Sequence, residues 1–400
     1  MSRGRYRFER YNIIRLKYMK YYIIAGEASG DLHGSNLIKG LVAEDPGAEF
    51  RFWGGPLMAA AAGCEPVVDY RQNAVMGYLE VLLKSFTIAK NLSLCKRDIA
   101  AWKPDVVILI DYPGFNFKVA KFAHEAGFKV FWYIAPKVWA SREGRIRKLK
   151  AYVDKLFIVF PFEKPYFDAH GVSYVYAGNP LVDAVDGSPS LSEPRSAFLE
   201  RCSLPDVPYI ALLAGSRNME IGNMMPTFME FADSWHASHP EYHFVVAAAP
   251  SRTMEDYSKF LGGRDYVHVV FGETYAAMKH ASAAVINSGT ASLEAALIGT
   301  PQIVGYKVAA ASAFIMRRII KVRYVSLANL IVDRLCFKEF LQENFTVQNL
   351  MGEMETNQSD SSYRAKMLSD YAEVRELLGG TGASRSVARA MLDTLKRDRK

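Results

Sequence analysis

A carboxylate directly after an apolar run is the first candidate for chemistry in this sequence. The run Val106–Ile110 has the length and composition of a buried strand, and Asp111 follows it at once. Catalytic groups of parallel α/β enzymes lie at the carboxyl ends of strands, where a carboxylate can take the proton of an attacking hydroxyl group. We therefore predict that Asp111 is a general base. The alternative is that Asp111 only accepts hydrogen bonds from turn amides before Pro113.

A Gly-Ser-Arg turn is the second candidate. Gly215, Ser216 and Arg217 come shortly after the apolar run Tyr209–Leu213. Backbone amides, a hydroxyl group and a guanidinium group suit a diphosphate. Such groups can stabilise the negative charge that develops on a departing diphosphate. We predict that Arg217 is catalytic and that Ser216 contacts the ligand; the alternative is a surface arginine on a loop.

A glycine-rich turn also follows the first predicted strand, Tyr21–Ala25. Its small residues allow close approach to the backbone, and free N–H groups at the start of the next helix favour an anionic or polar ligand. The candidate contacts are Gly26, Ser29, Gly30 and Asp31. The spacing is not GxGxxG and does not indicate a nicotinamide cofactor. The alternative is a tight structural turn in which Asp31 caps the helix.

A second small-residue turn follows the predicted strand Ala283–Ile286. Its candidate contacts are Ser288, Gly289, Thr290 and Glu294. The hydroxyl groups and the helix N-terminus could hold phosphate, and Glu294 could accept hydrogen bonds from ribose hydroxyls. The alternative is that Ser288 or Thr290 is a helix N-cap and that Glu294 is a solvated side chain.

Motifs for metals and common cofactors are absent from the sequence. It contains no DxD triplet, HExxH, GxSxG or Walker A motif, so we predict neither a metal nor another cofactor. The four cysteines are Cys64, Cys95, Cys202 and Cys336. They lie far apart without a CxxC pair, which is typical of a reduced compartment and predicts a cytoplasmic protein.

The positive charge is concentrated at the N-terminus. Residues 1–20 hold seven basic residues and one acidic residue, so they account for +6 of the net charge of +7. The rest of the chain is nearly neutral, which argues against nucleic acid as a partner. We interpret residues 1–18 as a dispensable extension or a mis-set start. No apolar run reaches the length of about 20 residues that a membrane span requires.

Apolar runs, turns and helical stretches alternate along the chain, as in parallel α/β domains. The predicted strands are Tyr21–Ala25, Glu49–Trp53, Val106–Ile110, Lys129–Ile134, Lys155–Val159, Tyr209–Leu213, His243–Ala248, Val267–Val270, Ala283–Ile286 and Gln302–Val304. The predicted helices include Asp31–Val42, Leu79–Ala101 and Asn116–Ala126.

The length of 400 residues predicts two domains. We place a first Rossmann-like domain at 19–185 and a second at 209–354. Glycine, serine and proline accumulate between them, so 186–208 is the predicted linker. Residues 355–400 are predicted to be helical, interrupted at 379–382, and to pack back across the domains or onto a partner subunit.

Eight motifs occur in order between about Lys20 and Leu350. They are Gly26-Glu27-Ala28-Ser29-Gly30-Asp31, Gly77-Tyr78-Leu79-Glu80-Val81-Leu82, Asp111-Tyr112-Pro113-Gly114-Phe115-Asn116, Phe160-Pro161-Phe162-Glu163, Gly178-Asn179-Pro180, Gly215-Ser216-Arg217, Ser288-Gly289-Thr290-Ala291-Ser292-Leu293-Glu294 and Tyr324-Val325-Ser326-Leu327-Ala328-Asn329. In combination they closely resemble the bacterial lipid-A-disaccharide synthase family.

The resemblance implies an α/β GT-B fold, in which two Rossmann-like domains, one for the acceptor and one for the UDP-sugar, face each other across a cleft. It implies an inverting glycosyltransferase that joins UDP-2,3-diacylglucosamine to 2,3-diacylglucosamine 1-phosphate through a β-1,6 bond and releases UDP. It supports Asp111 and Arg217 as catalytic residues and adds Glu220 and Asn329 as donor contacts. Ala214 and Ala328 stand where the family often has proline, which changes backbone stiffness and leaves the reacting groups in place.

An acylated acceptor implies contact with the inner membrane surface, and the enzyme is expected to associate with it peripherally. Val75–Phe86 is unusually apolar, and Phe314–Arg323 alternates apolar and basic pairs, so either could insert into the interface. The alternative is that both are ordinary helices facing the core. A homodimer is a further expectation.

Two other functions fit parts of the pattern. One is another GT-B enzyme, such as a UDP-sugar 2-epimerase or a transferase for an unacylated acceptor. The other is a nucleotide-binding or membrane-associated scaffold without catalytic activity, which would bind UDP without turnover.

Overall fold

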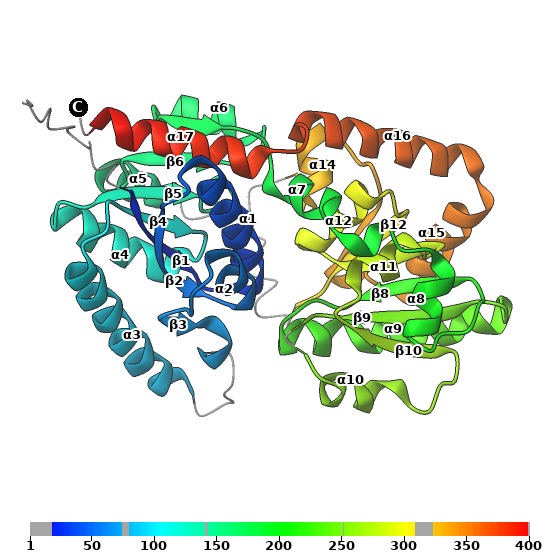
Figure 1. Cartoon of the computed structure of the whole chain (residues 1–400). Helices are drawn as coiled ribbons and strands as arrows, with labels where there is room; N and C mark the ends of the chain where they lie inside the picture. Colours follow the sequence, from blue (N-terminus) through cyan, green and yellow to red (C-terminus); the bar gives the residue numbers. More distant parts are fainter. Residues whose placement is uncertain (1–17, 74–79, 141–142, 251, 309–322, 399–400) are drawn as a thin grey trace, which may run out of the picture.

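The computed structural model describes residues 18–73, 80–140, 143–250, 252–308 and 323–398. Two all-parallel sheets form two α/β domains that lie side by side (Figure 1). The first sheet has seven strands in the order β3-β2-β1-β4-β5-β6-β7, and the second has six in the order β10-β9-β8-β11-β12-β13. The predicted fold class, two Rossmann-like domains, is confirmed.

The first domain is built from seven strands and the helices between them. The strands are β1 Lys20–Ala25, β2 Glu49–Gly54, β3 Val68–Asp69, β4 Val106–Ile110, β5 Lys129–Tyr133, β6 Lys155–Ile158 and β7 Tyr174–Tyr176. The helices are α1 Ala28–Glu44, α2 Pro56–Ala62, α3 Glu80–Trp102, α4 Pro113–Glu125, α5 Ile146–Tyr152 and α6 Glu163–Ala169.

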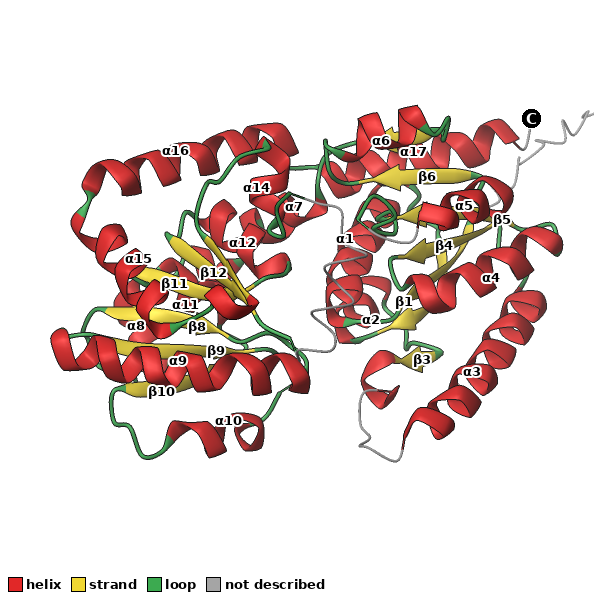
Figure 2. Cartoon of the chain, turned by 180° about the vertical axis from the view of Figure 1, so that it is seen from behind, coloured by secondary structure: helices red, strands yellow, loops and turns green. Residues whose placement is uncertain are grey.

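The second domain repeats the same plan. Its strands are β8 Tyr209–Leu213, β9 His243–Ala248, β10 Val267–Phe271, β11 Ala283–Asn287, β12 Gln302–Tyr306 and β13 Glu339–Leu341. The remaining helices are α7 Pro180–Asp186, α8 Arg195–Arg201, α9 Asn218–Ser238, α10 Met254–Leu261, α11 Thr274–Lys279, α12 Thr290–Ile298, α14 Leu327–Val332, α15 Val347–Ser359, α16 Ser361–Leu378 and α17 Ala383–Asp398. Figure 2 shows helices on both faces of each sheet.

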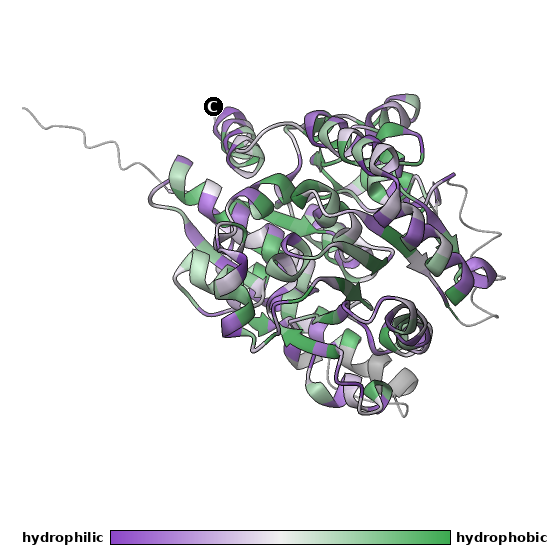
Figure 3. Ribbon diagram, turned by 90° about the vertical axis from the view of Figure 1, so that its right-hand side faces the viewer, coloured by the Kyte–Doolittle hydropathy of each residue, from purple (hydrophilic) through white to green (hydrophobic). Residues whose placement is uncertain are grey.

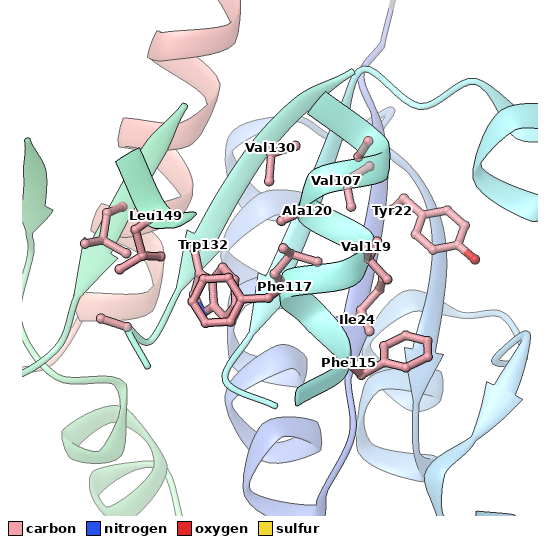
Figure 4. Close-up of a cluster of buried hydrophobic side chains, with 14 of the residues drawn as sticks. Tyr22, Ile24, Val107, Phe115, Phe117, Val119, Ala120, Val130, Trp132 and Leu149 are labelled. Carbon is pink, nitrogen blue, oxygen red and sulfur yellow. The ribbon is translucent and has the colours of Figure 1, made fainter. Parts of the chain in front are cut away.

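The central strands are continuous apolar runs because helices bury both of their faces. In Figure 3 the strands are mostly hydrophobic, whereas the outer helices carry hydrophilic residues. On one face of the first sheet, Tyr22, Val107 and Trp132 pack against Phe117 and other residues of α4 (Figure 4). This packing fixes the carboxyl ends of β1, β4 and β5, where the candidate residues lie.

Each sheet has a switch point, a pair of neighbouring strands where the direction of the strand order reverses. In the first sheet β1 lies beside β4 and Ala25 pairs with Ile110, so Gly26 and Asp111 follow adjacent strand ends. In the second sheet β8 lies beside β11 and Leu213 pairs with Ile286. Ligands of doubly wound sheets bind in the crevice at such points.

The segment predicted as a linker, 186–208, is partly helical and packs on the second domain. It contains the helix α8, whose Phe198 and Leu199 are buried against Tyr209 and Ala211 of β8. The glycine, serine and proline residues stand mainly before this helix, so composition indicated a break while two apolar side chains anchored the segment to the second core.

The C-terminal segment crosses from the second domain back to the first. Helix α16 packs on the second domain, and α17 lies along α1, where Val387 and Met391 share a cluster with Leu37 (Figure 1). The Asp183 carboxylate of α7 accepts hydrogen bonds from the backbone N–H groups of Gly382 and Ser384.

The chain passes between the two domains twice, before α7 and after α16, and the two crossing segments lie side by side. The backbone N–H of Asn179, just before α7, donates to the carbonyl of Leu378 at the end of α16 over 3.2 Å. The α carbon of Gly178 lies 3.8 Å from the position a Cβ would take on Gly379. The two crossings are therefore paired by direct backbone contact.

Three predictions concern residues outside those described. They are the N-terminal extension, of which residues 1–17 are not described, and the two proposed membrane segments, Val75–Phe86 and Phe314–Arg323, of which only the backbone from residue 80 and Arg323 are described. Among the described helices, none combines the length and apolar composition needed to cross a bilayer.

Candidate active site

A cavity of about 280 Å³ lies between the two domains. Its lining residues are Gly26, Glu27, Ser29, Gly30, Ile110, Asp111, Tyr112, Pro113, Lys137, Arg145 and Arg217. All but Arg217 belong to the first domain. The structure therefore brings together Asp111 and Arg217, the two residues predicted to be catalytic, from opposite sides of one cleft.

The backbone at Asp111 is strained. Asp111 and Tyr112 have φ angles of 42° and 45°, which are unfavourable for residues with side chains. The amide of buried Asn116 donates to the carbonyl groups of Ile110 and Asp111, and the Tyr112 ring stacks on Phe115. Such strain persists where surrounding contacts fix the backbone, and it is concentrated at functional sites.

The electrostatic surroundings of Asp111 suit a proton acceptor. Burial raises the pKa of the Asp111 carboxyl group, the nearby Lys137 charge lowers it, and Glu27 raises it, with a net upward shift. A carboxylate with a raised pKa holds an abstracted proton more firmly. The general-base role of Asp111 stays a prediction, and the buried carboxyl group in the cavity is its structural basis.

An ion pair joins the domains across the cleft. Arg217 Nη2 lies 3.0 Å from Glu27 Oε2, and their side chains are 60% and 55% exposed. Exposed pairs of this kind contribute about 0–1 kcal/mol. A bound phosphate group could therefore take the place of the Glu27 carboxylate at little cost.

Glu220 holds the Gly-Ser-Arg turn. Its carboxylate accepts hydrogen bonds from the backbone N–H groups of Ser216 and Arg217 and from the Arg217 guanidinium. Gly215 has a φ of 101°, and a Cβ there would lie 2.5 Å from Glu220 Oε2. Glu220 thus holds the backbone and the guanidinium group of Arg217, and its predicted donor contact stays a prediction.

The predicted turn after β11 lies beside the Gly-Ser-Arg turn after β8. Ser288, Gly289 and Thr290 follow β11 and lead into α12, at the strand end next to Gly215. These residues do not line the 280 Å³ cavity. Glu294 accepts a hydrogen bond from Tyr275 over 2.8 Å, and burial raises the pKa of its carboxyl group. Their donor contacts remain predictions.

Asp31 and Asn329 both hold neighbouring segments in place, and their predicted ligand contacts stay predictions. Buried Asp31 accepts hydrogen bonds from the N–H groups of Gly55, Leu57 and Met58, so it caps α2 and not its own helix. Asn329 is 0% exposed. Its side-chain amide donates to the Phe337 carbonyl and the Glu339 carboxylate and accepts from the N–H of Cys336, so both polar atoms of the side chain have partners within the second domain.

Three charged residues of the cavity were not among the predicted site residues: Glu27, Lys137 and Arg145. Glu27 stands inside the first glycine-rich turn, which gave a usable signal. Lys137 comes four residues after β5, the strand next to β4, so its position in the sheet order could have indicated it. Arg145 immediately precedes a short helix and had no comparable signal.

Two Rossmann-like domains that face each other across a cleft place this chain in the GT-B fold class. Solved structures show the same fold. The UDP-GlcNAc 2-epimerase of Neisseria meningitidis, bound to UDP-GlcNAc, has a TM-score of 0.69 at 15% identity, covering 94% of this chain and 100% of that one. The UDP-GlcNAc 2-epimerase of Methanocaldococcus jannaschii has a TM-score of 0.66 at 14% identity, with 94% and 99% covered.

Sequence comparison gives the family. A family model described as lipid-A-disaccharide synthetase matches residues 21–392. The lipid-A-disaccharide synthase of Geobacter metallireducens is 38% identical over 94% of this chain and 97% of the relative. That of Myxococcus xanthus is 38% identical over 93% of this chain and 97% of the relative. The chain belongs to the lipid-A-disaccharide synthetase family.

Proposed function

We propose that this chain is a UDP-sugar-dependent hexosyltransferase that joins UDP-2,3-diacylglucosamine to 2,3-diacylglucosamine 1-phosphate. The product is lipid A disaccharide 1-phosphate, with a β-1,6 bond, and UDP is released. Membership of the family over residues 21–392 supports the reaction. The structural observation that carries the proposal is the presence of Asp111 and Arg217 on opposite domains in one cavity.

The proposed reaction is a single displacement with inversion at the anomeric carbon. The acceptor 6-hydroxyl oxygen attacks this carbon, and its proton passes to the Asp111 carboxylate. The bond between the anomeric carbon and the diphosphate oxygen breaks, and the electron pair leaves with UDP. Arg217 stabilises the negative charge that develops on the diphosphate.

We propose that donor binding changes the ion-pair partner of Arg217. The diphosphate takes the place of Glu27, whose pair with Arg217 is exposed to solvent. Glu220 keeps the Arg217 backbone in place throughout, because it binds two amides of the turn. The guanidinium group thereby changes ligand without movement of the loop that carries it.

The test is UDP release by the purified full chain with both acylated glucosamine substrates. Asp111→Asn is expected to lower kcat by about 10²- to 10⁴-fold, and Arg217→Met by about 10²- to 10³-fold. Asp111→Asn is expected to remain folded and to bind UDP. An unchanged rate for Asp111→Asn would show that Asp111 is not the base.

Conversion of UDP-GlcNAc without an acceptor would support the epimerase alternative, and UDP binding without turnover would support the scaffold.

The acylated substrates further support peripheral association with the inner membrane, and a homodimer is proposed with it. Flotation of the full chain with vesicles containing anionic lipid tests the first, and light scattering tests the second. Protein that stays at the bottom of the gradient, or a monomeric mass, would contradict the respective proposal.

A further inference from the structure

We infer that Lys137 and Arg145 form a subsite for the phosphate group of the acceptor. The inference rests on the proposed function, because that function supplies an acceptor with a phosphate on its anomeric carbon. It assigns a role to two cavity residues that the proposed reaction steps do not use.

The two cations lie on the acceptor side of the cleft. Lys137 follows β5 and Arg145 precedes α5, both in the first domain, and both line the cavity that contains Asp111. The third cation of this lining, Arg217, comes from the second domain and pairs with Glu27 and Glu220. The charges are therefore divided, with one cation on the donor side and two on the side of the base.

The loop that carries Lys137 is held rigidly. Its neighbours Ala135 and Val138 are buried in the first core. The Tyr166 hydroxyl donates to the Val138 carbonyl over 3.2 Å. Trp139 Nε1 donates to the buried Glu163 carboxylate over 3.2 Å. Lys137 itself is exposed, so a fixed backbone presents its ammonium group to the cleft.

The Arg145 side chain is oriented by an aromatic ring. Its guanidinium carbon lies 5.7 Å from the centre of the Phe117 ring, which itself packs on Trp132 at 4.6 Å. Buried Ile146 fixes the adjacent turn. A guanidinium placed over a ring keeps its planar fork, the geometry that binds two oxygens of one phosphate.

The chemistry of the acceptor requires such a subsite close to Asp111. Its 6-hydroxyl must lie at the base, and its phosphate is bonded to C1 of the same sugar ring. The phosphate therefore lies within one sugar of Asp111, in the same cavity. A phosphate monoester carries up to two negative charges near neutral pH, which matches two cations.

The experiment compares two acceptors, 2,3-diacylglucosamine 1-phosphate and the same sugar with a methyl group at C1 in place of phosphate. The variants are Lys137→Met and Arg145→Met, with Lys137→Arg and Arg145→Lys to restore charge. Arg147→Met is the matched control, because Arg147 is exposed on α5 and does not line the cavity. UDP affinity and thermal unfolding are measured for each variant.

The methionine variants are expected to lower kcat/KM for the phosphorylated acceptor by about 10- to 100-fold, mainly through KM. The preference of the enzyme for the phosphorylated acceptor should fall by a similar factor, and Lys137→Arg and Arg145→Lys should recover part of it. Equal losses with both acceptors would overturn the subsite, because they would indicate an effect on Asp111 or on folding. No loss would also overturn it. A wild-type chain that releases no UDP with either acceptor would instead contradict the proposed function.

Discussion

Gly26 lies directly against the ring of Tyr112. A Cβ atom on Gly26 would stand 2.5 Å from two carbons of that ring, Cγ and Cδ1, which is far inside contact distance. Tyr112 follows Asp111 in the strained turn after β4. Because Gly26 has no side chain, the Tyr112 ring can pack against the end of β1. This contact helps to position Asp111, the candidate base at the end of β4.

Gly26→Ala is expected to displace Tyr112 and with it Asp111. We expect a loss of about 1–3 kcal/mol in the free energy of unfolding and a fall in kcat of about 10²-fold. Gly114→Ala is the matched control, because a Cβ there meets no atom within 4 Å. Urea unfolding and UDP release measure the two effects. Equal stability and activity of the two variants would contradict this account of the turn.

The pH profile of kcat/KM should show an acid limb that reports Asp111. Because burial raises the pKa of Asp111, activity should be lost at a higher pH than the ordinary aspartate value of about 3.9. Lys137 lowers this pKa and Glu27 raises it. Lys137→Met should therefore move the limb to higher pH, and Glu27→Gln should move it to lower pH. Shifts in the same direction for both variants would disprove the assignment.

Glu27→Gln should also tighten UDP binding. The substitution removes the carboxylate that competes with the diphosphate for Arg217, and the exposed pair contributes at most about 1 kcal/mol, so the gain should not exceed about fivefold. Glu49→Gln is a suitable control, since Glu49 pairs with Lys20, an exposed pair that does not line the cleft. Calorimetric titration with UDP measures both. Weaker binding by Glu27→Gln would show that Glu27 helps to hold the ligand.

Glu163 should make stability depend on pH. Burial raises the pKa of its carboxyl group from 4.5 to about 7. The native state therefore binds more protons than the unfolded state between these values, so the free energy of unfolding falls as pH rises through this window. Relative to Glu163→Gln, the wild type should lose up to roughly 3 kcal/mol between pH 4 and pH 8. Urea unfolding at a series of pH values measures the free energy of unfolding of both proteins. A difference between wild type and Glu163→Gln that does not change with pH would contradict the prediction.

The main strands could be predicted from the sequence because apolar runs buried on both faces are unambiguous. Val106–Ile110 and Tyr209–Leu213 have the predicted bounds. The strands β3, β7 and β13 were missed, since they have two or three residues and only half-buried side chains. Such short segments show no periodicity.

The site could be predicted in part. Asp111 and Arg217 were found because each directly follows or closely follows a buried strand, and the sheet order then brings them to the cleft. The side-chain partners of Asp31 and Asn329 could not be predicted from the sequence. A sequence indicates that a polar residue stands in a turn, but not whether its side chain faces a ligand or the amides of a neighbouring segment, because those partners are distant in the chain.

The paired crossings at 178–179 and 379–382 have a mechanical consequence. Two polypeptide segments in contact at one point form a pivot about which the domains can bend, while twisting of one domain about a single linker is resisted by the second segment. We expect this pairing to direct changes in the width of the cleft between Asp111 and Arg217 into rotations about the contact. The start of the last helix is tied to this joint through the hydrogen bond from Ser384 to Asp183.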